Sequence, residues 1–362
     1  MKIAILGTKG VPNNHGGFEQ FAEYLSEHLT IKGHDVSVYS PHNHPYQHKK
    51  WKGVDIIHQY DPEGILGSAG QFIYDLNCIL HIRKSKFDIV LQLGYTSSSI
   101  WGKLLPRKSI IVTNMDGLEW KRSKYSKPTQ IFLKFAEALA INTSDFLISD
   151  SIGIQNYLKE KYDKQSEYIA YGANVFLNPE ESVIKEYYIS PHNYNLLIAR
   201  LEPENNIETI LDGVVLNNNT TPFLVIGKYN TKYGKYLVNK FKPSKNIIFL
   251  GAIYNQNHLN NLRYYSNLYF HGHSVGGTNP SLLEAMASSA LIVANDNIFN
   301  KSILNDDAFY FSNSIEVSQL LNKIKLQHTG FVKNNKSKII NQYTLNVINE
   351  QYENFLKECL KK

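Results

Sequence analysis

The sequence predicts an α/β protein made of two doubly wound domains, each with a parallel sheet covered by helices. Three observations support this fold class. The chain has 362 residues, which is more than one hydrophobic core usually holds. Short apolar runs alternate with amphipathic stretches of helical period, as in strand-helix-strand units with parallel strands. This series starts twice, once at Lys2 and again at Leu196.

The first domain opens with an expected strand at 2–6, a glycine-containing loop and an amphipathic helix that Gly33 ends. The apolar residues of that helix fall on one face, namely Phe18, Phe21, Ala22, Leu25 and Leu29. Further apolar runs predict buried strands at 36–39, 54–58, 88–92, 110–113 and 146–149.

The second domain repeats the pattern. Its expected strands are 196–199, 223–227, 247–251, 268–270 and 291–294. A turn at 171–174 and the polar segment 178–181 between the two series predict a linker. We therefore expect domains at 1–173 and 174–340. The remaining residues, 341–362, contain an amphipathic helix at 347–360, which we expect to pack back on the first domain.

The most informative stretch runs from 271 to 287 and reads HGHSVGGTNPSLLEAMA. Asn279 is a good N-cap and Pro280 suits the first helical position, so a helix should start sharply there. The first turn of a helix has unpaired N–H groups and a partial positive charge, which together favour a diphosphate. Gly276 and Gly277 let the backbone approach such a ligand closely.

Glu284 lies one turn into this expected helix. Its carboxylate can accept hydrogen bonds from a pair of ribose hydroxyls beside the phosphate site. The combination indicates a nucleotide. An ordinary capped helix after a turn is the alternative interpretation.

Composition and charge narrow the function classes. The net charge of +6 comes from scattered lysines, so nucleic-acid binding is not expected. Cys78 and Cys359 are the two cysteines and have no metal-like spacing. We interpret His42, His44 and His48 as surface residues and expect no metal site. The apolar start of the chain is too short for a signal-peptide core and no run is long enough for a transmembrane helix, so a cytoplasmic location is expected.

Four segments occur in a characteristic order: GGFE at 16–19, NMDGLEWKR at 114–122, ARLEPENN at 199–206 and GGTNPS at 276–281. With them the chain resembles, over essentially its whole length, the GT-B glycosyltransferases of retaining family 4. More narrowly, it resembles a bacterial rhamnosyltransferase-like subgroup. The resemblance implies two Rossmann-like domains that face each other across a cleft, an acceptor-binding N-terminal one and a C-terminal one that binds the nucleotide sugar.

The resemblance also implies transfer of a sugar from a nucleoside diphosphate donor, with retained configuration, no cofactor and no obligatory metal. Arg200 matches an arginine that neutralises the departing diphosphate. Asn205 stands where a lysine is usual, and Gly276 stands at the first of two glutamate positions, of which Glu284 keeps the second. The expected donor-binding residues are Arg200, Asn205, Gly276, Gly277, Thr278, Asn279, Ser281 and Glu284.

Catalysis requires a group that takes or orients the proton of the acceptor hydroxyl. Asp116, just past the strand 110–113, is the best candidate, and an Asp-Gly turn is the alternative interpretation. Asp150 follows the strand 146–149, but Ser149, Asp150 and Ser151 can equally form a helix cap. The expected catalytic set is Asp116, Arg200 and Asp150.

The expected acceptor-binding residues are Gly16, Gly17, Glu19, Glu119, Trp120, Lys121 and Arg122. An indole stacks on a sugar face and cations attract phosphate, although Lys121 can equally lie on a solvated loop. The subgroup resemblance implies an acceptor sugar on a polyprenyl diphosphate at the inner membrane face, in synthesis of capsule, O-antigen or wall polysaccharide. Mixed apolar and basic residues at 101–108 and 132–135 fit peripheral membrane binding, and core packing explains the apolar ones equally well.

The favoured donor is dTDP-L-rhamnose, by resemblance alone, and a retaining hexosyltransferase that uses a UDP- or GDP-sugar is the alternative. Two readings of other classes are a nicotinamide-dependent oxidoreductase and a non-catalytic nucleotide-sugar-binding protein. The oxidoreductase fits poorly, because the loop from Gly7 to Gly10 lacks the G-x-G-x-x-G spacing and the second strand has no acidic residue at its end.

Overall fold

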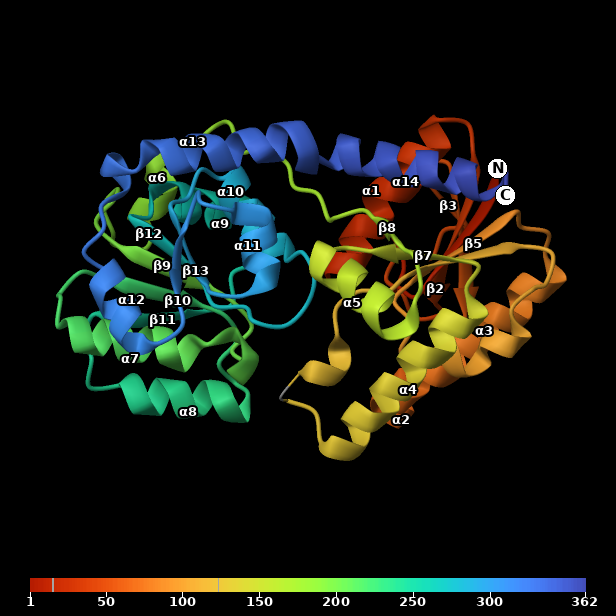
Figure 1. Ribbon diagram of the computed structural model, residues 1–362, viewed down its shortest axis with the longest axis horizontal. Helices are drawn as coiled ribbons and strands as arrows, with labels where there is room; N and C mark the ends of the chain where they lie inside the picture. Colours follow the sequence, from red (N-terminus) through yellow and green to blue (C-terminus); the bar gives the residue numbers. More distant parts are fainter. Residues whose placement is uncertain (15, 123) are drawn as a thin grey trace. The chain divides into compact units, whose positions relative to one another are not determined.

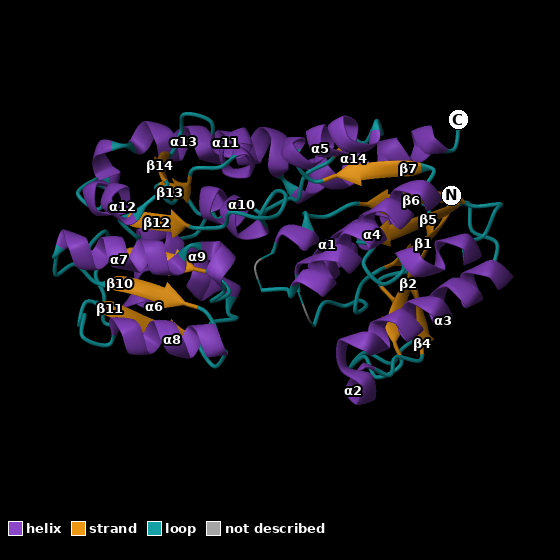
Figure 2. Ribbon diagram, turned by 60° about the horizontal axis from the view of Figure 1, so that its bottom comes forward, coloured by secondary structure: helices purple, strands orange, loops and turns teal. Residues whose placement is uncertain are grey.

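The computed structural model describes residues 1–14, 16–122 and 124–362, which form two compact units. The first unit comprises Met1–Trp120, Tyr125–Ala170 and Leu345–Lys362. The second comprises Lys121–Lys124 and Tyr171–Thr344. Each unit has its own sheet of mainly parallel strands with helices packed around it (Figures 1 and 2). The predicted α/β class with two doubly wound sheets is confirmed.

The sheet of the first unit has eight strands in the order β3-β4-β2-β1-β5-β6-β7-β8. Neighbouring strands run parallel except for β3 and β4. Their bounds are Lys2–Leu6 (β1), Asp35–Pro41 (β2), Lys50–Trp51 (β3), Val54–Gln59 (β4), Ile89–Leu93 (β5), Ile110–Asn114 (β6), Phe146–Ser149 (β7) and Glu167–Tyr168 (β8). All six predicted strands are present. The other two are only two residues long, which is too short for a periodic pattern.

Six α-helices belong to this part of the described chain. They are α1 (Gly17–Ile31), α2 (Glu63–Leu66), α3 (Gly70–Lys84), α4 (Lys127–Thr143), α5 (Ile152–Tyr162) and α14 (Leu345–Cys359). The last one comes from the end of the chain and packs on α1. The rings of Phe21 and Tyr352 lie 4.8 Å apart between centroids, and Glu353 lies 3.2 Å from both His28 and His34. The C-terminal helix is therefore part of the first unit.

The second sheet has six parallel strands in the order β11-β10-β9-β12-β13-β14. Their bounds are Asn195–Ile198 (β9), Phe223–Ile226 (β10), Ile247–Gly251 (β11), Leu268–His271 (β12), Ile292–Asn295 (β13) and Phe309–Phe311 (β14). Its helices are α6 (Glu181–Lys185), α7 (Ile207–Asn217), α8 (Lys232–Phe241), α9 (Gln256–Tyr265), α10 (Pro280–Ala287), α11 (Ile298–Leu304), α12 (Ser314–Leu320) and α13 (Thr329–Lys338). The short strand β14 was not predicted.

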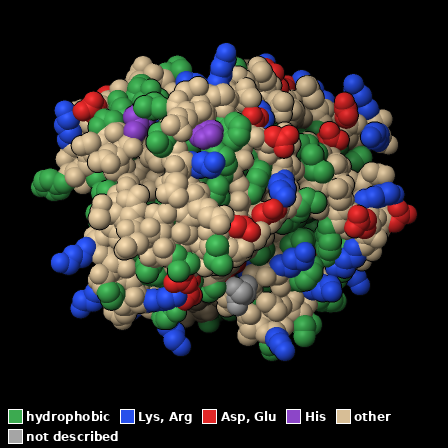
Figure 3. All heavy atoms as spheres, turned by 60° about the vertical axis from the view of Figure 1, so that its left-hand side comes forward, with side chains coloured by type: hydrophobic (Ala, Val, Ile, Leu, Met, Phe, Trp, Pro, Cys, Tyr) green, Lys and Arg blue, Asp and Glu red, His purple; other side chains and the backbone are tan. Residues whose placement is uncertain are grey.

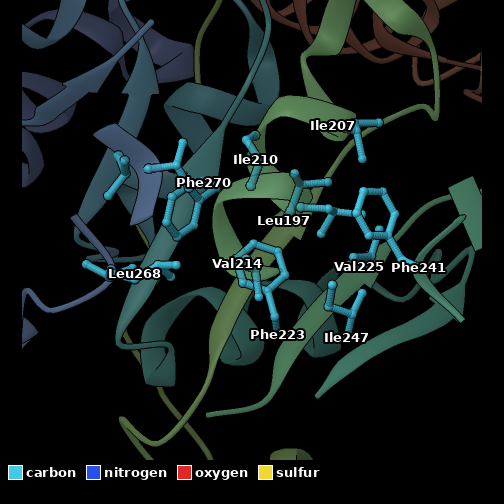
Figure 4. Close-up of a cluster of buried hydrophobic side chains, with 14 of the residues drawn as sticks. Leu197, Ile207, Ile210, Val214, Phe223, Val225, Phe241, Ile247, Leu268 and Phe270 are labelled. Carbon is cyan, nitrogen blue, oxygen red and sulfur yellow. The ribbon is translucent and has the colours of Figure 1, made fainter. Parts of the chain in front are cut away.

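A buried aromatic and aliphatic cluster holds the second sheet and its helices together (Figure 4). Phe223 on β10 and Phe270 on β12 lie 5.3 Å apart between ring centroids, and Leu197 on β9 packs in the same cluster. Because β9 and β12 are parallel neighbours, the loops that follow them leave the sheet at the same edge. The core thus fixes the place where the arginine loop and the glycine-rich loop meet.

The surface matches the dispersed charge of the sequence. Acidic and basic side chains are interspersed on the face shown in Figure 3.

One expectation about the surface is wrong: His44 is buried, and its Nδ1 accepts the N–H of Tyr46 at 3.1 Å. The turn-rich segment folds back over this ring, and burial lowers its pKa. None of the described helices combines the length and the apolar composition needed to cross a membrane.

Candidate functional site

The glycine-rich loop leads from β12 into α10 as the sequence predicts. Pro280 is the first residue of the helix, and the side chain of Asn279 accepts the N–H of Ser281 at 2.9 Å. Leu282, Leu283 and Met286 are buried. The predicted cap, start and buried stripe of this helix are confirmed. Gly276 has a φ of 125°, a backbone conformation that a side chain at this position would disfavour.

The loop after β9 is tied to the glycine-rich loop by hydrogen bonds. The hydroxyl of Ser274 donates to the carbonyl of Glu204 at 2.7 Å, and the side-chain amide of Asn206 donates to the carbonyl of Gly272 at 2.8 Å. A Cβ at Gly272 would lie 2.0 Å from the carbonyl oxygen of Asn205, so only glycine permits this approach. The two loops form one structural element at the carboxyl edge of the sheet.

Arg200 lies on the first of these loops and is exposed. Asn205 is buried, and its side-chain amide donates to the carbonyl of Arg200 at 2.8 Å. The asparagine that replaces the usual lysine therefore supports the backbone that carries the arginine.

Glu284 lies one turn into α10, with a quarter of its side chain exposed. Its Oε2 accepts a hydrogen bond from Nη2 of Arg263 at 2.5 Å. Arg263 lies in the last turn of α9 and is fully buried. No role was expected for this residue, although an arginine among the apolar positions of an amphipathic helix is a usable signal.

Two histidines of the stretch 271–287, for which no role was expected, also lie at this site. The rings of His271 and His273 stack at 4.4 Å between centroids, at the end of β12 and in the loop that follows. Burial lowers the pKa of His273 to about 3, and the positive charges of Arg200 and Arg122 act in the same direction. Its imidazole is therefore neutral at pH 7.

Asp116 follows β6 in a left-handed backbone conformation with a φ of 49°. Its N–H donates to Oδ1 of Asn114 at 2.9 Å, and the amide of Asn114 donates to the hydroxyl of Tyr352 at 2.7 Å. Burial raises the pKa of Tyr352, and the negative charges of Asp150 and Asp116 raise it further. The charges of both candidate carboxylates therefore act on one buried hydroxyl of α14.

Asp150 follows β7 and is buried. The N-cap of α5 is Ser151, whose hydroxyl accepts the N–H of Ile154 at 3.2 Å. The segment does form a helix cap, but the capping residue is Ser151 and not Asp150.

The first loop ends at the start of α1. Gly16 and Gly17 are exposed, whereas Glu19 is buried. Oε1 of Glu19 accepts the N–H of Lys9 at 2.7 Å. This carboxylate therefore shapes the loop between β1 and α1.

Trp120 lies in a 3-10 turn at Glu119–Lys121. Its indole N–H donates to Oε2 of Glu137 at 3.0 Å, and Glu137 is buried in α4. The ammonium groups of Lys134 and Lys161 lie 5.1 and 5.5 Å from the centre of the indole ring. The indole N–H of Trp120 is therefore already used in a hydrogen bond to a buried carboxylate. Lys121 is exposed and Arg122 is half-buried.

The sequence-predicted residues fall into two groups. The donor candidates gather at the carboxyl edge of the second sheet. Asp116, Asp150 and the first loop lie at the carboxyl edge of the first sheet, because β1, β5, β6 and β7 are successive parallel strands. Across residues 1–14, 16–122 and 124–362, no cluster of three or more His, Cys, Asp or Glu side chains has the arrangement of a metal site.

Two family models match the chain. Residues 1–174 match a domain of unknown function (DUF1972), and residues 184–326 match the glycosyl transferases group 1. No curated protein matches the chain significantly.

Solved structures match almost the whole chain. Sucrose-phosphate synthase from Thermosynechococcus elongatus superimposes with a TM-score of 0.81 at 15% identity, with 98% of each chain covered. The fold is that of a GT-B glycosyltransferase. HepE from Anabaena in complex with UDP and glucose has a TM-score of 0.75 at 14% identity, with 99% of each chain covered. A glycosyltransferase from Rickettsia africae has a TM-score of 0.71 at 16% identity, with 99% of this chain and 98% of the other covered. These likenesses show the fold, and the match of residues 184–326 to the glycosyl transferases group 1 supports glycosyltransferase activity.

Proposed function

We propose that this protein of GT-B fold is a glycosyltransferase that moves a sugar, with retained configuration, from a nucleoside diphosphate donor to a saccharide on a polyprenyl diphosphate. The favoured donor is dTDP-L-rhamnose and the favoured pathway is synthesis of a bacterial cell-surface polysaccharide. One observation carries the donor side of the proposal. The capped start of α10, the Arg200 loop and the Glu284 carboxylate share one sheet edge, joined by the Ser274 hydrogen bond.

On this proposal the diphosphate binds at the start of α10. The partial positive charge at the start of the helix and the backbone N–H groups of the glycine-rich loop that leads into it stabilise the diphosphate. Gly276, Gly277, Thr278, Asn279 and Ser281 supply the backbone and side-chain donors. Glu284 accepts the hydroxyls of the nucleoside sugar, which are a pair in a ribonucleotide and the 3′-hydroxyl alone in dTDP. HepE, which was crystallised with UDP and with UDP-glucose, supports a nucleotide sugar as the donor class.

Arg200 carries the largest share of charge stabilisation in this scheme. As the glycosidic C–O bond lengthens, negative charge grows on the leaving diphosphate. Charge stabilisation of this kind is typically worth a factor of about 10²–10³ in kcat. No lysine stands at position 205, so the arginine and the helix start act without that second cation. No step requires a metal or a cofactor.

Asp116 is the proposed partner of the acceptor hydroxyl, whose proton it takes or orients during attack on the anomeric carbon. The hydrogen bond from its own N–H to Asn114 holds the turn that presents the carboxylate. Asp150 is the second carboxylate whose charge acts on the buried Tyr352 hydroxyl. Gly16, Gly17, Glu19, Glu119, Trp120, Lys121 and Arg122 are proposed to bind the acceptor, with Glu19 and Trp120 acting mainly by shaping their loops.

The inner face of the cell membrane is the proposed location of the lipid-linked acceptor. On α4, Ile131 and Phe135 are exposed next to the exposed Lys134. On the 3-10 helix Ser99–Leu104, Ile100 and Lys103 are exposed in the same way. Apolar side chains beside lysines are typical of surfaces that bind anionic lipids.

The test is a product assay. The purified protein is incubated with dTDP-rhamnose, UDP-glucose and a GDP-hexose, each with a short-chain polyprenyl diphosphate saccharide, and products are identified by mass. Addition of a deoxyhexose supports the favoured donor, and addition of a hexose supports the UDP- or GDP-sugar alternative. No product from any donor, despite binding of a nucleotide sugar, would mean a non-catalytic binding protein.

Two variants control this assay. Asp116→Asn and Arg200→Ala should each abolish most product formation while thermal unfolding stays close to that of the wild type. Sedimentation with anionic vesicles tests the membrane surface, where Phe135→Ser should weaken binding and absence of wild-type binding would refute the location.

A further inference from the structure

Arg263 is the largest fully buried side chain among those the structure describes, and no motif of the donor site includes it. Its Nη2 donates to Oε2 of Glu284 at 2.5 Å and its Nη1 donates to Oδ1 of Asn260 at 3.1 Å. A guanidinium cannot lose its charge in a protein. Burying it is therefore costly unless an anion pairs with it. In this structure the paired anion is the carboxylate proposed to bind the nucleoside.

The pair is asymmetric in its exposure. The Arg263 side chain is 1% exposed, whereas that of Glu284 is 25% exposed. The Glu284 carboxylate is therefore bound on its buried side by Arg263 and is partly accessible to solvent on its other side. A carboxylate has two oxygens and about four acceptor sites, and Oε2 serves the arginine. Within the described part of the chain, no hydrogen bond to Oε1 is present, so this oxygen is available to a ligand.

The arginine also joins the carboxylate to the start of α10. Burial raises the pKa of Tyr269, and the guanidinium of Arg263 opposes this shift from close by. The hydroxyl of Tyr269 lies 2.9 Å from that of Ser281, whose N–H is capped by Asn279. At the other end of the helix, the hydroxyl of Ser288 donates to Oδ1 of Asn260 at 3.3 Å. Tyr269 of β12 thus contacts the start of α10, and Asn260 of α9 contacts its end.

We propose that Arg263 is a positioning residue for donor binding, which fixes the Glu284 carboxylate in the orientation that accepts hydroxyls of the nucleoside sugar. This inference rests on the proposed function and deepens it. Without the arginine, the carboxylate loses its orientation relative to the phosphate-binding turn. Affinity should then fall for the part of the ligand that carries hydroxyls and not for the diphosphate.

The experiment measures Kd by calorimetry for two matched pairs of ligands: UDP with 2′,3′-dideoxy-UDP, and dTDP with 3′-deoxy-dTDP. We define the hydroxyl ratio as the Kd of the deoxygenated nucleotide divided by the Kd of its hydroxyl-bearing partner. For the pair with the preferred base, this ratio should be about 10 to 100 in the wild type, as expected for a hydrogen bond to a charged group. Glu284→Gln and Arg263→Met should both reduce this ratio nearly to one. Arg263→Lys should restore part of it.

A matched control separates positioning from general destabilisation. Lys325→Met removes another buried basic side chain of the same unit, whose Nζ donates to the carbonyl of Tyr264 at the end of α9. It should change stability without changing the hydroxyl ratio. If Arg263→Met does not fold, the double variant Arg263→Met/Glu284→Gln removes the unpaired carboxylate as well. The double variant should then show the same ratio as Glu284→Gln alone.

The outcomes separate the inference from the proposed function. If the wild type binds none of the four nucleotides, the proposed donor site is wrong and the inference falls with it. If the wild type discriminates through Glu284 but Arg263→Met keeps the full ratio, the proposed function stands and Arg263 is only a structural partner. A loss of ratio in Lys325→Met equal to that in Arg263→Met would also overturn the inference.

Discussion

Replacing Tyr352 by phenylalanine removes one hydroxyl from α14 and should slow catalysis at Asp116, which lies more than 200 positions earlier in the chain. The hydroxyl accepts the side-chain amide of Asn114 at 2.7 Å, and Asn114 in turn accepts the N–H of Asp116 at 2.9 Å. Tyr352 and Asn114 are both buried. Loss of the hydroxyl leaves the asparagine amide without this acceptor, so the asparagine is expected to reorient.

The magnitude follows from the energies of these groups. A buried polar group left unsatisfied costs about 1–3 kcal/mol, which sets the expected loss of stability. A left-handed backbone at a residue other than glycine costs about 1–2 kcal/mol, and the hydrogen bond to Asn114 contributes about 0.5–1.5 kcal/mol. The two terms are comparable, so the turn at Asp116 depends on that bond. Misplacement of a reacting group by about 1 Å costs up to about a hundredfold in rate.

The assay compares kcat and the free energy of unfolding in Tyr352→Phe and in a control. Tyr194→Phe is the control, because Tyr194 is also fully buried and its hydroxyl donates to the carbonyl of Leu262 at 2.6 Å in the second unit. Both variants should lose similar stability, but only Tyr352→Phe should lose tenfold or more in kcat with little change in donor Kd. An unchanged kcat in Tyr352→Phe would refute the link from α14 to Asp116.

Three further predictions concern single side chains. Burial alone would raise the pKa of Glu353, but hydrogen bonds from Lys357, His34 and His28 lower it to about 2 from 4.5, a shift equivalent to about 3 kcal/mol. Urea titrations should therefore show the full difference in unfolding free energy between the wild type and Glu353→Gln above pH 4.5. This difference should vanish as the pH falls through 2, and a difference independent of pH would contradict the prediction. Asn279→Ala should lower the free energy of unfolding by about 1 kcal/mol and weaken donor binding. Asn313→Ala removes the equivalent cap of α12 and should lower stability only. Equal donor Kd values in the two variants would refute the role of Asn279 in donor binding. Arg200→Ala should lower kcat by about 10²–10³ with Arg200→Lys intermediate, and equal kcat values in steady-state assays would exclude the charge role.

The sequence predicted the sheets well because their central strands are continuous apolar runs. The start of α10 was also predictable, since Asn279 and Pro280 are local signals that need no tertiary contact. Strands β3, β8 and β14 have only two or three residues. Their pairing depends on the neighbouring strand, so no periodic pattern marked them.

The candidate site was only partly predictable, because its supporting contacts join distant segments. Arg263 meets Glu284 across 21 positions, and Tyr352 meets Asn114 across 238. Trp120 stands in a polar motif that favoured acceptor binding, yet its indole N–H is bonded to the buried Glu137. Local sequence shows which side chains have useful chemistry, and the tertiary fold decides which way each of them faces.

The most direct test of the donor site is a crystal structure of the protein with the nucleoside diphosphate that it binds most tightly. The diphosphate oxygens should lie within hydrogen-bond distance of backbone N–H groups in the segment from Gly277 to Asn279, with the Arg200 guanidinium beside them. The nucleoside sugar should contact Glu284. A diphosphate bound away from the start of α10, or a nucleoside sugar directed away from Glu284, would contradict the account.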